Sequence, residues 1–367
     1  MKRLKLPTLS SRRDWLLAAI ATYVVVQVLM SLQIIDAFYQ PILQVGCLFG
    51  IMSLGLNLIY GFNGQFSLGQ FGFYALGAYT AADITYRLND ANRLHRVLSL
   101  GPLTWDWGQA VAFMFAIAVA VGLCALVAFL FGLPVLKLGS DYFGIASLGF
   151  TMVMFVLANN SDTILGFQEM KGARGMVGIP PLTTWFWTFL FLVLSLLLVR
   201  NLLYSSPGRA ILSVREDETA AKAMGIDVVR YKLISFVIGS ALAGLAGALY
   251  AHLYAFLHPS IFHFIKSFDP LIIVVFGGLG SMTGTVLAAL AWALLLQGLA
   301  VSVLPSSLLE WRYVLYAVAL VAMMLLRPQG LMGGSELGFL KHIRPALRRN
   351  KAAAAQASPG EAPHDIK

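Results

Sequence analysis

The sequence predicts an all-α fold, a polytopic transmembrane helical bundle with about nine or ten membrane segments. Three observations predict it. Of the 367 residues, 59% are hydrophobic and only 12% are charged, whereas soluble chains carry roughly 25% charged residues. Apolar blocks recur at the length of about 20 residues that a helix needs to cross a bilayer. Basic residues gather in alternate connecting segments, as expected when cytoplasmic loops are positively charged.

The apolar blocks predict the membrane segments in order along the chain. Eight are expected near 15–35, 42–60, 66–84, 109–132, 143–158, 182–200, 232–257 and 311–326. A ninth block, 270–303, would be about 50 Å long as one helix. Its middle reads "FGGLGSMTGT", so we interpret it as a segment that enters from outside, breaks at Gly277–Gly280 and turns back. The alternative is a tight turn joining two tilted helices near one surface.

Charge sets the predicted orientation and domain limits. With the N-terminus inside, segments 1–14, 133–142, 200–232 and the tail from Arg327 carry 19 of the 26 Lys and Arg residues. The net charge of +9 is therefore topological and gives no reason to expect nucleic acid as a partner. We expect a basic cytoplasmic N-terminus at 1–14, a membrane domain at 15–333, and a polar, disordered cytoplasmic tail at 334–367.

Polar residues and glycines mark a candidate solute pathway. The stretch 60–82, "YGFNGQFSLGQFGFYALGAYTAA", mixes bare backbone with uncharged polar side chains. Such groups at membrane depth usually face a bundle interior or a wet path. The candidate pathway residues are Asn57, Asn63, Gln65, Ser67, Gln70, Gly277, Gly278, Gly280 and Ser281. The alternative is that they bond to neighbouring helices. A further helix, 236–254, carries small residues along one face, and its neighbour is expected within this chain or in a partner.

The inside loop at 204–231 is predicted to fold. Ser206 before Pro207 is typical of a helix start, Asp217 can cap a second short helix, Gly225 can end it, and Asp227 can cap the next membrane helix. We call residues 204–231 the coupling loop, because its alternating charges indicate a surface on which a partner docks. The candidate docking residues are Arg215, Glu216, Asp217, Glu218, Ala220, Ala221 and Gly225. Ala220 and Ala221 would seat in a groove of the partner, and the acidic residues would pair with its rim. The alternative is a well-capped, solvated loop.

Several strings carry a resemblance to a known family. "TAAKAMG" (219–225) resembles the EAA loop of ABC importer permeases, with Thr219 where a glutamate usually stands. The wider "GRAILSVREDETAAKAMGIDVVRYKL" is similar to the branched-chain amino acid permease family, especially its LivM type. "LGLNLIYGFNGQFSLGQFGFYALGAYTAA", "DYFGIASLGF", "GARGMVGIP", "FGGLGSMTGTVLAA" and "LLRPQGLMG" agree in order over 42–333.

The resemblance implies partners and an activity. It implies an ATP-driven importer of branched-chain amino acids or a related small solute in a bacterial inner membrane. The implied partners are a second, LivH-like permease subunit, two cytoplasmic ATP-binding subunits and a periplasmic solute-binding protein. The sequence contains no Gly-x-x-x-x-Gly-Lys-Ser/Thr loop, so ATP hydrolysis is expected in a separate chain, and this chain is not expected to be an enzyme.

Other function classes fit the sequence less well. A self-powered carrier or channel is the main alternative, but carboxylates and histidines are scarce within the predicted spans, which favours an external energy source. We expect no cofactor and no metal site. Cys47 and Cys124 lie in apolar blocks and are expected to be small buried hydrophobes, whereas His252, His258 and His263 are expected at the surface.

Overall fold

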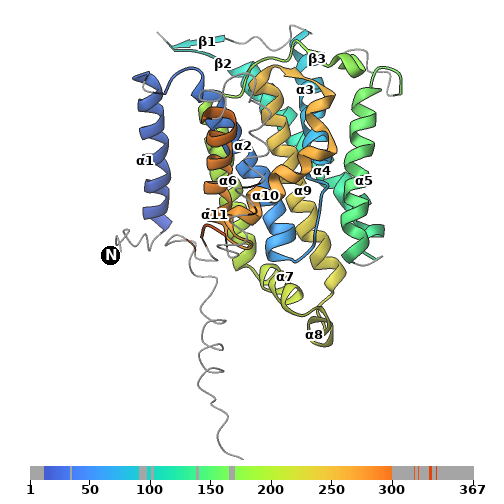
Figure 1. Cartoon of the computed structure of the whole chain (residues 1–367). Coiled ribbons are helices and arrows are strands. Elements are labelled where there is room, and N and C mark those ends of the chain that lie inside the picture. The colour runs from blue at the N-terminus through green and yellow to red at the C-terminus, as the bar shows by residue number, and fades with distance from the viewer. Residues whose placement is uncertain are drawn as a thin grey trace, which may run out of the picture.

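The structure is a bundle of helices, as the sequence predicts (Figure 1). The computed structural model describes residues 12–33, 35–90, 97–100, 103–137, 140–164, 170–299, 318, 321, 330–332 and 336. Apart from residues 318 and 321, the predicted last span at 311–326 lies outside the described residues. The predicted tail at 334–367 also lies outside them, except for Glu336.

The described helices and strands follow one another without a large sheet. The first half of the chain holds α1 (Arg12–Ser31), α2 (Tyr39–Leu56), its π-helical continuation η1 (Asn57–Phe62), α3 (Gln70–Asp90), β1 (Val97–Leu100), β2 (Leu103–Asp106), α4 (Trp107–Val135) and α5 (Ser140–Asn159). The second half holds η3 (Gly172–Arg174), β3 (Met176–Val177), α6 (Trp185–Tyr204), α7 (Ser206–Glu216), α8 (Glu218–Ala223), α9 (Val228–Tyr254), β4 (Phe256–Leu257), η4 (Pro259–Phe262), η5 (Phe264–Ser267), α10 (Phe268–Gly277), α11 (Met282–Ala293) and the π-helical η6 (Leu294–Leu299).

The two ends of the bundle differ in structure (Figure 1). Two short antiparallel ribbons, β1 with β2 and β3 with β4, lie at one end, which we call the ribbon end. Helices α7 and α8 project from the opposite end, which we call the loop end. Since α9 follows α8 and is followed by β4, it runs from the loop end to the ribbon end.

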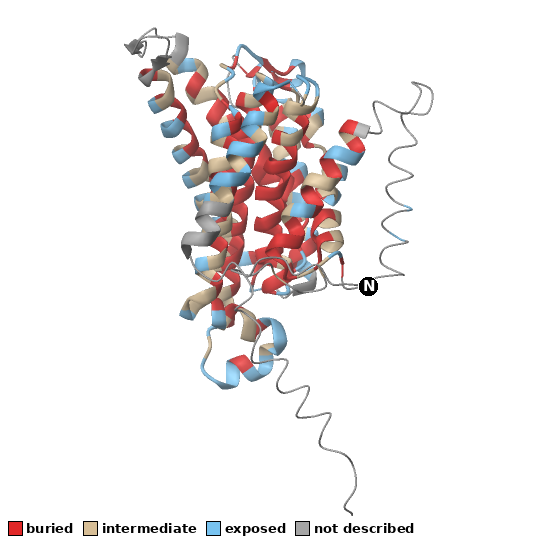
Figure 2. Ribbon diagram, turned by 90° about the vertical axis from the view of Figure 1, so that its left-hand side faces the viewer, coloured by how far each residue is buried: buried red, intermediate tan, exposed pale blue. Residues whose placement is uncertain are grey.

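Burial separates central helices from peripheral ones. Five described helices are long and apolar enough to cross a membrane: Tyr39–Phe62, Gly108–Val135, Tyr142–Asn159, Trp185–Tyr204 and Val228–Tyr254. The first is 94% buried and the last 72% buried over their apolar windows, against 28–33% for the other three. Buried residues therefore run along the centre of the bundle (Figure 2). The peripheral helices expose apolar side chains such as Val111, Ile145 and Leu194, as lipid-facing helices do.

The small face of α9 packs against helices of this chain. A Cβ added at Gly239 would lie 2.6 Å from the Gly55 carbonyl oxygen of α2. A Cβ at Gly77 of α3 would clash with the Gly244 carbonyl of α9. These approaches require glycine, because any side chain would push the backbones apart. Of the two neighbours considered for this face, the structure shows an intrachain one.

The third predicted span begins later than expected. The sequence predicts a helix from residue 66, but α3 begins at Gln70 and residues 64–69 form no regular secondary structure. This segment is bonded to α5: the Leu68 amide donates to Ser147 Oγ at 2.9 Å, and Thr151 Oγ1 donates to the Leu68 carbonyl at 3.1 Å. Non-helical backbone at membrane depth persists when protein groups satisfy it in this way.

The ninth block is broken where the sequence predicts. Helix α10 ends at Gly277 and α11 starts at Met282, with Gly278 and Gly280 at positive φ. A Cβ at Gly277 would lie 2.5 Å from the Gly284 carbonyl oxygen, so the two helices meet at the break as a hairpin. Helix α11 then runs toward the ribbon end beside α2, because Asn57 meets Thr285 at one end of their contact and Phe49 meets Trp292 at the other.

Candidate functional site

Asn57 holds the tip of the α10–α11 hairpin. Its amide nitrogen donates to the Ser281 carbonyl and to Thr285 Oγ1, each at 2.9 Å. Its amide oxygen accepts the Gly280 N–H, also at 2.9 Å. All hydrogen-bonding positions of the Asn57 side chain that face the hairpin are thus in use. For Asn57, Gly280 and Ser281 the geometry favours the alternative considered from the sequence, bonds between helices.

The C-terminal segment also contacts this tip. The Leu331 and Met332 amides donate to the carbonyls of Phe276 and Gly277 at the end of α10. The Glu336 carboxylate accepts the backbone N–H groups of Met282 and Thr283 at the start of α11, at 2.6 and 3.2 Å. A carboxylate at a helix N-terminus satisfies otherwise unpaired donors. Glu336 was assigned to the polar tail by composition, which gave no signal for this contact.

The polar residues after α2 are less completely bonded. Asn63 Nδ2 donates to Gln65 Oε1 at 3.1 Å, and the Gly69 amide donates to Ser67 Oγ at 3.3 Å. The amide oxygen of Asn63, the amide nitrogen of Gln65 and both amide atoms of Gln70 are buried without a partner. Of the predicted pathway residues, these three therefore retain free hydrogen-bonding capacity.

The coupling loop is folded by the caps that the sequence predicts, with one shift. The first cap is Ser205 and not Ser206: its hydroxyl accepts the Gly208 N–H, and Pro207 follows in the first turn. Asp217 Oδ1 accepts the amides of Thr219 and Ala220, starting α8. Gly225, at φ +80°, ends that helix. Asp227 Oδ1 then accepts the Arg230 amide at the start of α9. Caps of this kind each stabilise a helix by about 1 kcal/mol.

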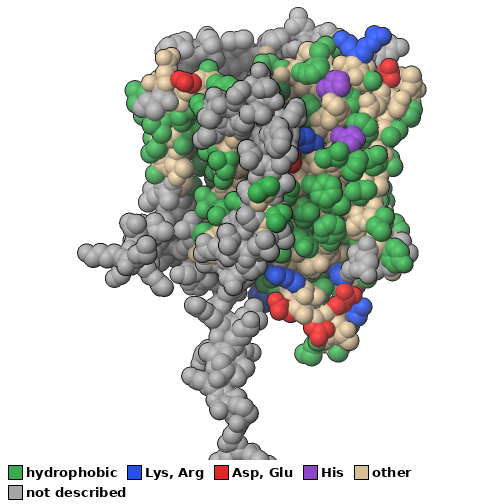
Figure 3. All heavy atoms as spheres, in the orientation of Figure 1, with side chains coloured by type: hydrophobic (Ala, Val, Ile, Leu, Met, Phe, Trp, Pro, Cys, Tyr) green, Lys and Arg blue, Asp and Glu red, His purple; other side chains and the backbone are tan. Residues whose placement is uncertain are grey.

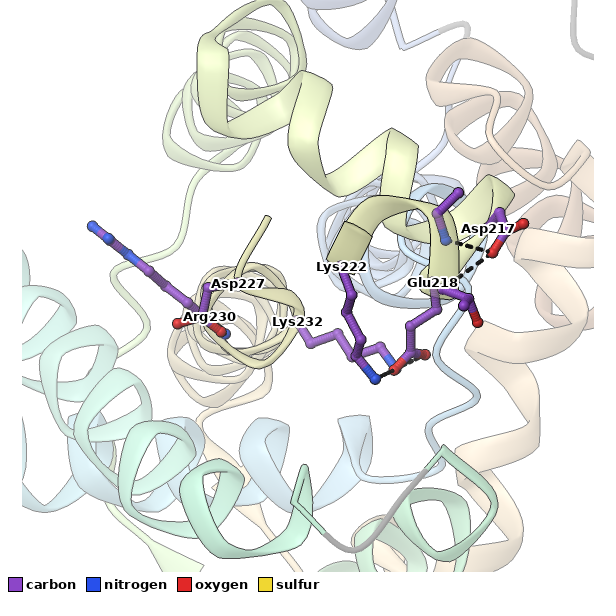
Figure 4. Close-up of polar contacts among 8 residues, drawn as sticks. Asp217, Glu218, Lys222, Asp227, Arg230 and Lys232 are labelled. Carbon is purple, nitrogen blue, oxygen red and sulfur yellow. Dashed lines mark hydrogen bonds and ion pairs between the residues drawn. The ribbon is translucent and has the colours of Figure 1, made fainter. Parts of the chain in front are cut away.

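The acidic residues of the loop are partly engaged within the chain (Figure 4). Glu218 pairs with Lys222 at 3.0 Å and with Lys232 at 2.7 Å. Lys232 is buried in the first turns of α9, so this contact ties α8 to a central membrane helix. The hydrogen bond from Lys232 is the main cause that lowers the pKa of Glu218 below its usual value. Glu216 and Arg215, in contrast, are exposed.

The alanines of α8 face in different directions. Ala221 is buried in a small cluster with Val214 and Val228, so its methyl group packs within the loop. Ala221 is therefore turned away from the exposed surface of α8, and the seating of this helix in a partner's groove stays a prediction. Ala220 is exposed, and Met224 at the end of α8 is 82% exposed. A space-filling view shows apolar side chains at the tip of the loop beside acidic and basic ones (Figure 3). Met224 is not among the residues predicted to dock, because a single Met in a short helix carries no periodic signal.

One histidine was misassigned from the sequence. His252 was expected at the surface but is fully buried in α9. Its Nδ1 lies 2.7 Å from the Ala248 carbonyl and its Nε2 lies 2.9 Å from Thr85 Oγ1 of α3. Both cysteines are buried, as predicted. Among the residues that the structure describes, no group of three His, Cys, Asp or Glu side chains is placed to hold a metal ion.

These features define a polytopic membrane protein: a central helix bundle with a broken hairpin, partly bonded polar groups at depth, and a capped, charged loop at one end. Comparison with known families identifies it further. The family described as "Branched-chain amino acid transport system / permease component" matches residues 39–324, and the chain belongs to this family.

Curated relatives agree with the family match. The LivM permease protein of the high-affinity branched-chain amino acid transport system of Escherichia coli K12 is 32% identical over 333 residues, covering 83% of this chain and 70% of that protein. LivM of Salmonella typhimurium is 32% identical over 316 residues, 77% of this chain and 67% of that protein. LivH of Escherichia coli K12 is 25% identical over 313 residues, 80% of this chain and 93% of that protein. No solved structure matches the chain significantly.

Proposed function

We propose that the chain is the LivM-type membrane subunit of an ATP-driven importer for branched-chain amino acids or a related small solute. The importer would reside in a bacterial inner membrane, with a LivH-like second permease, two cytoplasmic ATP-binding subunits and a periplasmic solute-binding protein. The named relatives are permease proteins of a branched-chain amino acid transport system, which supports the substrate class. This chain lacks a phosphate-binding loop, so its energy must come from another subunit.

The coupling loop carries the proposal. Side-chain caps start its two short helices, Ser205 for α7 and Asp217 for α8, and a third cap, Asp227, starts α9. Glu218 ties α8 to buried Lys232 of α9. A push on α8 would therefore reach the central helix rather than being absorbed by a flexible loop. Exposed Ala220 and Met224 would seat in a groove of the ATP-binding subunit, since methionine adapts well to apolar surfaces. Exposed Glu216 and Arg215 would orient the contact through rim charges.

A matched pair of substitutions at Gly225 tests the docking role. A Cβ added at Gly225 would contact no other atom, so the positive φ of this residue is the only obstacle to a side chain there. Valine at such a φ is strongly disfavoured, whereas asparagine tolerates it. Gly225→Val should reduce co-purification of the ATP-binding subunit and solute-stimulated ATP hydrolysis about fivefold or more, while Gly225→Asn stays near wild type. Equal, wild-type behaviour of both variants would show that this loop does not couple the subunits.

The carrier alternative has a direct test. The described spans show few ionisable side chains at depth, so a self-powered cycle lacks an evident proton relay. The purified chain alone should not accumulate labelled leucine in liposomes under a proton or sodium gradient. The complete complex with ATP should. Gradient-driven accumulation by the chain alone would replace the importer proposal by the carrier.

Orientation can be measured separately. We propose that both termini and the loop end are cytoplasmic and that the ribbon end faces outward. Lys171 near the ribbon end and Lys222 of α8 are both exposed, so a cysteine at either position can react with a soluble reagent. In sealed cells, a membrane-impermeant maleimide should label Lys171→Cys and not Lys222→Cys. The reverse pattern would invert the orientation.

A further inference from the structure

Three buried aromatic residues from three helices meet near the middle of the bundle. Phe49 of α2 stacks on Trp292 of α11, with ring centroids 4.3 Å apart. On another side it contacts Tyr74 of α3 at 6.4 Å. Phe49 lies ten residues after Tyr39, where α2 starts at the ribbon end, or about 15 Å along the helix. The aromatic group therefore lies near half the thickness of the hydrocarbon core.

The polar atoms of this group have no partners. The Tyr74 hydroxyl and the Trp292 indole nitrogen are both buried without a hydrogen bond, in residues that are 1% and 7% exposed. When buried, both groups usually find a partner. A buried donor left unsatisfied is unfavourable, so these atoms call for an occupant that the chain itself does not supply.

A second pair of unpartnered residues lies one helical turn closer to the loop end. Helix α3 runs parallel to α9, because Gly77 meets Gly244 and Thr85 meets His252, and α2 runs antiparallel to both. One turn forward from Phe49 along α2 is Ser53, and one turn back from Tyr74 along α3 is Gln70. Both steps move about 6 Å toward the loop end, so Ser53 and Gln70 lie at the same depth. Ser53 Oγ and both amide atoms of Gln70 are buried without a partner, in residues that are 0% and 1% exposed.

Gln70 is also the first residue of a helix that begins inside the bundle. Given the pairing of Gly77 with Gly244, Gln70 lies opposite the third turn of α9, about 14 Å from its start. Two of the amides at this helix start are already bonded, since the Gly69 amide donates to Ser67 Oγ and the Gly72 amide donates to the Gly69 carbonyl. What α3 offers at this point is therefore the Gln70 side-chain amide, which can both donate and accept.

We infer that Ser53, Gln70, Tyr74 and Trp292 form a solute site at the start of α3, with Phe49 as its apolar wall. This inference rests on the proposed function and names the residues of this chain that the solute would contact. The aromatic rings suit an apolar side chain, and the hydroxyl, amide and indole groups suit the ammonium and carboxylate of a small zwitterion. The four polar residues carry no charge, so a passing solute would be held weakly enough to be released.

Substitutions that remove the polar atoms but keep the shape test the site. Gln70→Met and Tyr74→Phe should lower ATP-driven uptake of labelled leucine by the reconstituted complex about fivefold or more. The unfolding temperature of the subunit should stay the same or rise, because each change removes an unsatisfied polar group. Reduced uptake by an equally or more stable protein is a signature that a packing defect would not produce.

Matched controls remove equivalent atoms elsewhere in the bundle. Tyr79 Oη of α3 and Ser195 Oγ of α6 are also buried and unpartnered. Tyr79 lies more than one turn from Tyr74 toward the ribbon end, with its ring against Phe262, and Ser195 lies on α6, a helix that contributes no residue to the proposed site. Tyr79→Phe and Ser195→Ala should leave uptake at the wild-type level. Wild-type uptake in Gln70→Met and Tyr74→Phe, or an equal loss of uptake in the controls, would contradict the proposed site. Ordered water would then be the partner of these polar atoms. Absence of ATP-driven leucine uptake by the wild-type complex would overturn the proposed function and the site with it.

Discussion

Two polar residues one turn apart, Ser53 of α2 and Asn57 at the start of its continuation η1, behave in opposite ways. Asn57 makes three hydrogen bonds to the tip of the α10–α11 hairpin, whereas Ser53 is buried and its hydroxyl makes none. The same contrast separates two larger groups. The tip of the α10–α11 hairpin is hydrogen-bonded by Asn57 and also by Glu336, whereas the polar atoms of Gln70, Tyr74 and Trp292 have no partner. Bonded groups hold helices together in a medium without a hydrophobic push. Unbonded polar atoms add no hydrogen bond between helices and are unfavourable when buried, so their place in the bundle calls for another explanation.

The largest expected effect on stability follows from removing the hydrogen bonds of Asn57. Asn57→Leu removes three hydrogen bonds and leaves the Gly280 N–H, the Ser281 carbonyl and Thr285 Oγ1 without that partner. At about 1 kcal/mol for each bond, plus the cost of the groups left unsatisfied, the free energy of unfolding should fall by about 3–5 kcal/mol. Thermal unfolding of the purified subunit in detergent measures it.

Asn57→Asp is the matched comparison for this change. It keeps the acceptor for Gly280, but it loses both donors and places a buried carboxylate oxygen against the Ser281 carbonyl. It should therefore destabilise the subunit at least as much as Asn57→Leu at neutral pH. If Asn57→Leu unfolds at the wild-type temperature, the clamp does not hold the hairpin, and the contrast with Ser53 loses its basis.

A smaller effect is expected at the coupling loop. Glu218→Gln should lower the free energy of unfolding by about 1 kcal/mol, because it removes the charge facing buried Lys232, while the exposure of Glu218 screens the pair. Glu216→Gln, on an exposed neighbour, is the control and should change nothing measurable. A stabilised Glu218→Gln variant would show that burying the Lys232 ammonium beside a carboxylate is a net cost.

The same pair gives a pH dependence with a defined sign. Since the pKa of Glu218 is lowered in the folded protein, the contribution of the pair is fully present above the unfolded pKa of a glutamate. It is lost as the pH falls through the folded pKa of Glu218. The difference in unfolding temperature between wild type and Glu218→Gln should therefore be constant at neutral pH and shrink in acid. A difference that grows on acidification would exclude this pair as its source.

Local signals predicted the loop well and the membrane interior less well. Asp217, Gly225 and Asp227 act within three residues of themselves, so sequence spacing was enough to place the caps. Residues 66–69 were expected in a helix, and their non-helical form depends on Ser147 and Thr151 of α5, far along the chain. Ala221 and Met224 lie in one short helix whose inward face is chosen by Val214 and Val228. Tertiary contacts decide which polar residue has a hydrogen-bond partner. Asn57 and Gln70 were both predicted pathway residues, and only the position of the α10–α11 hairpin distinguishes them.

The smallest expected effect has the opposite sign and sharpens the comparison. Ser53→Ala removes a buried hydroxyl that has no partner and puts a better helix former in its place. The free energy of unfolding should therefore rise by about 0.5–1.5 kcal/mol, the reverse of Asn57→Leu one turn away. Ser195 on α6 is also buried and unpartnered, so Ser195→Ala should raise the free energy of unfolding by a similar amount. Stability alone therefore does not distinguish the two sites. Transport does: if Ser53 contacts solute, the stabilised Ser53→Ala complex should import leucine more slowly than Ser195→Ala. A destabilised Ser53→Ala would mean that its hydroxyl is bonded in the folded protein, and the contrast with Asn57 would disappear.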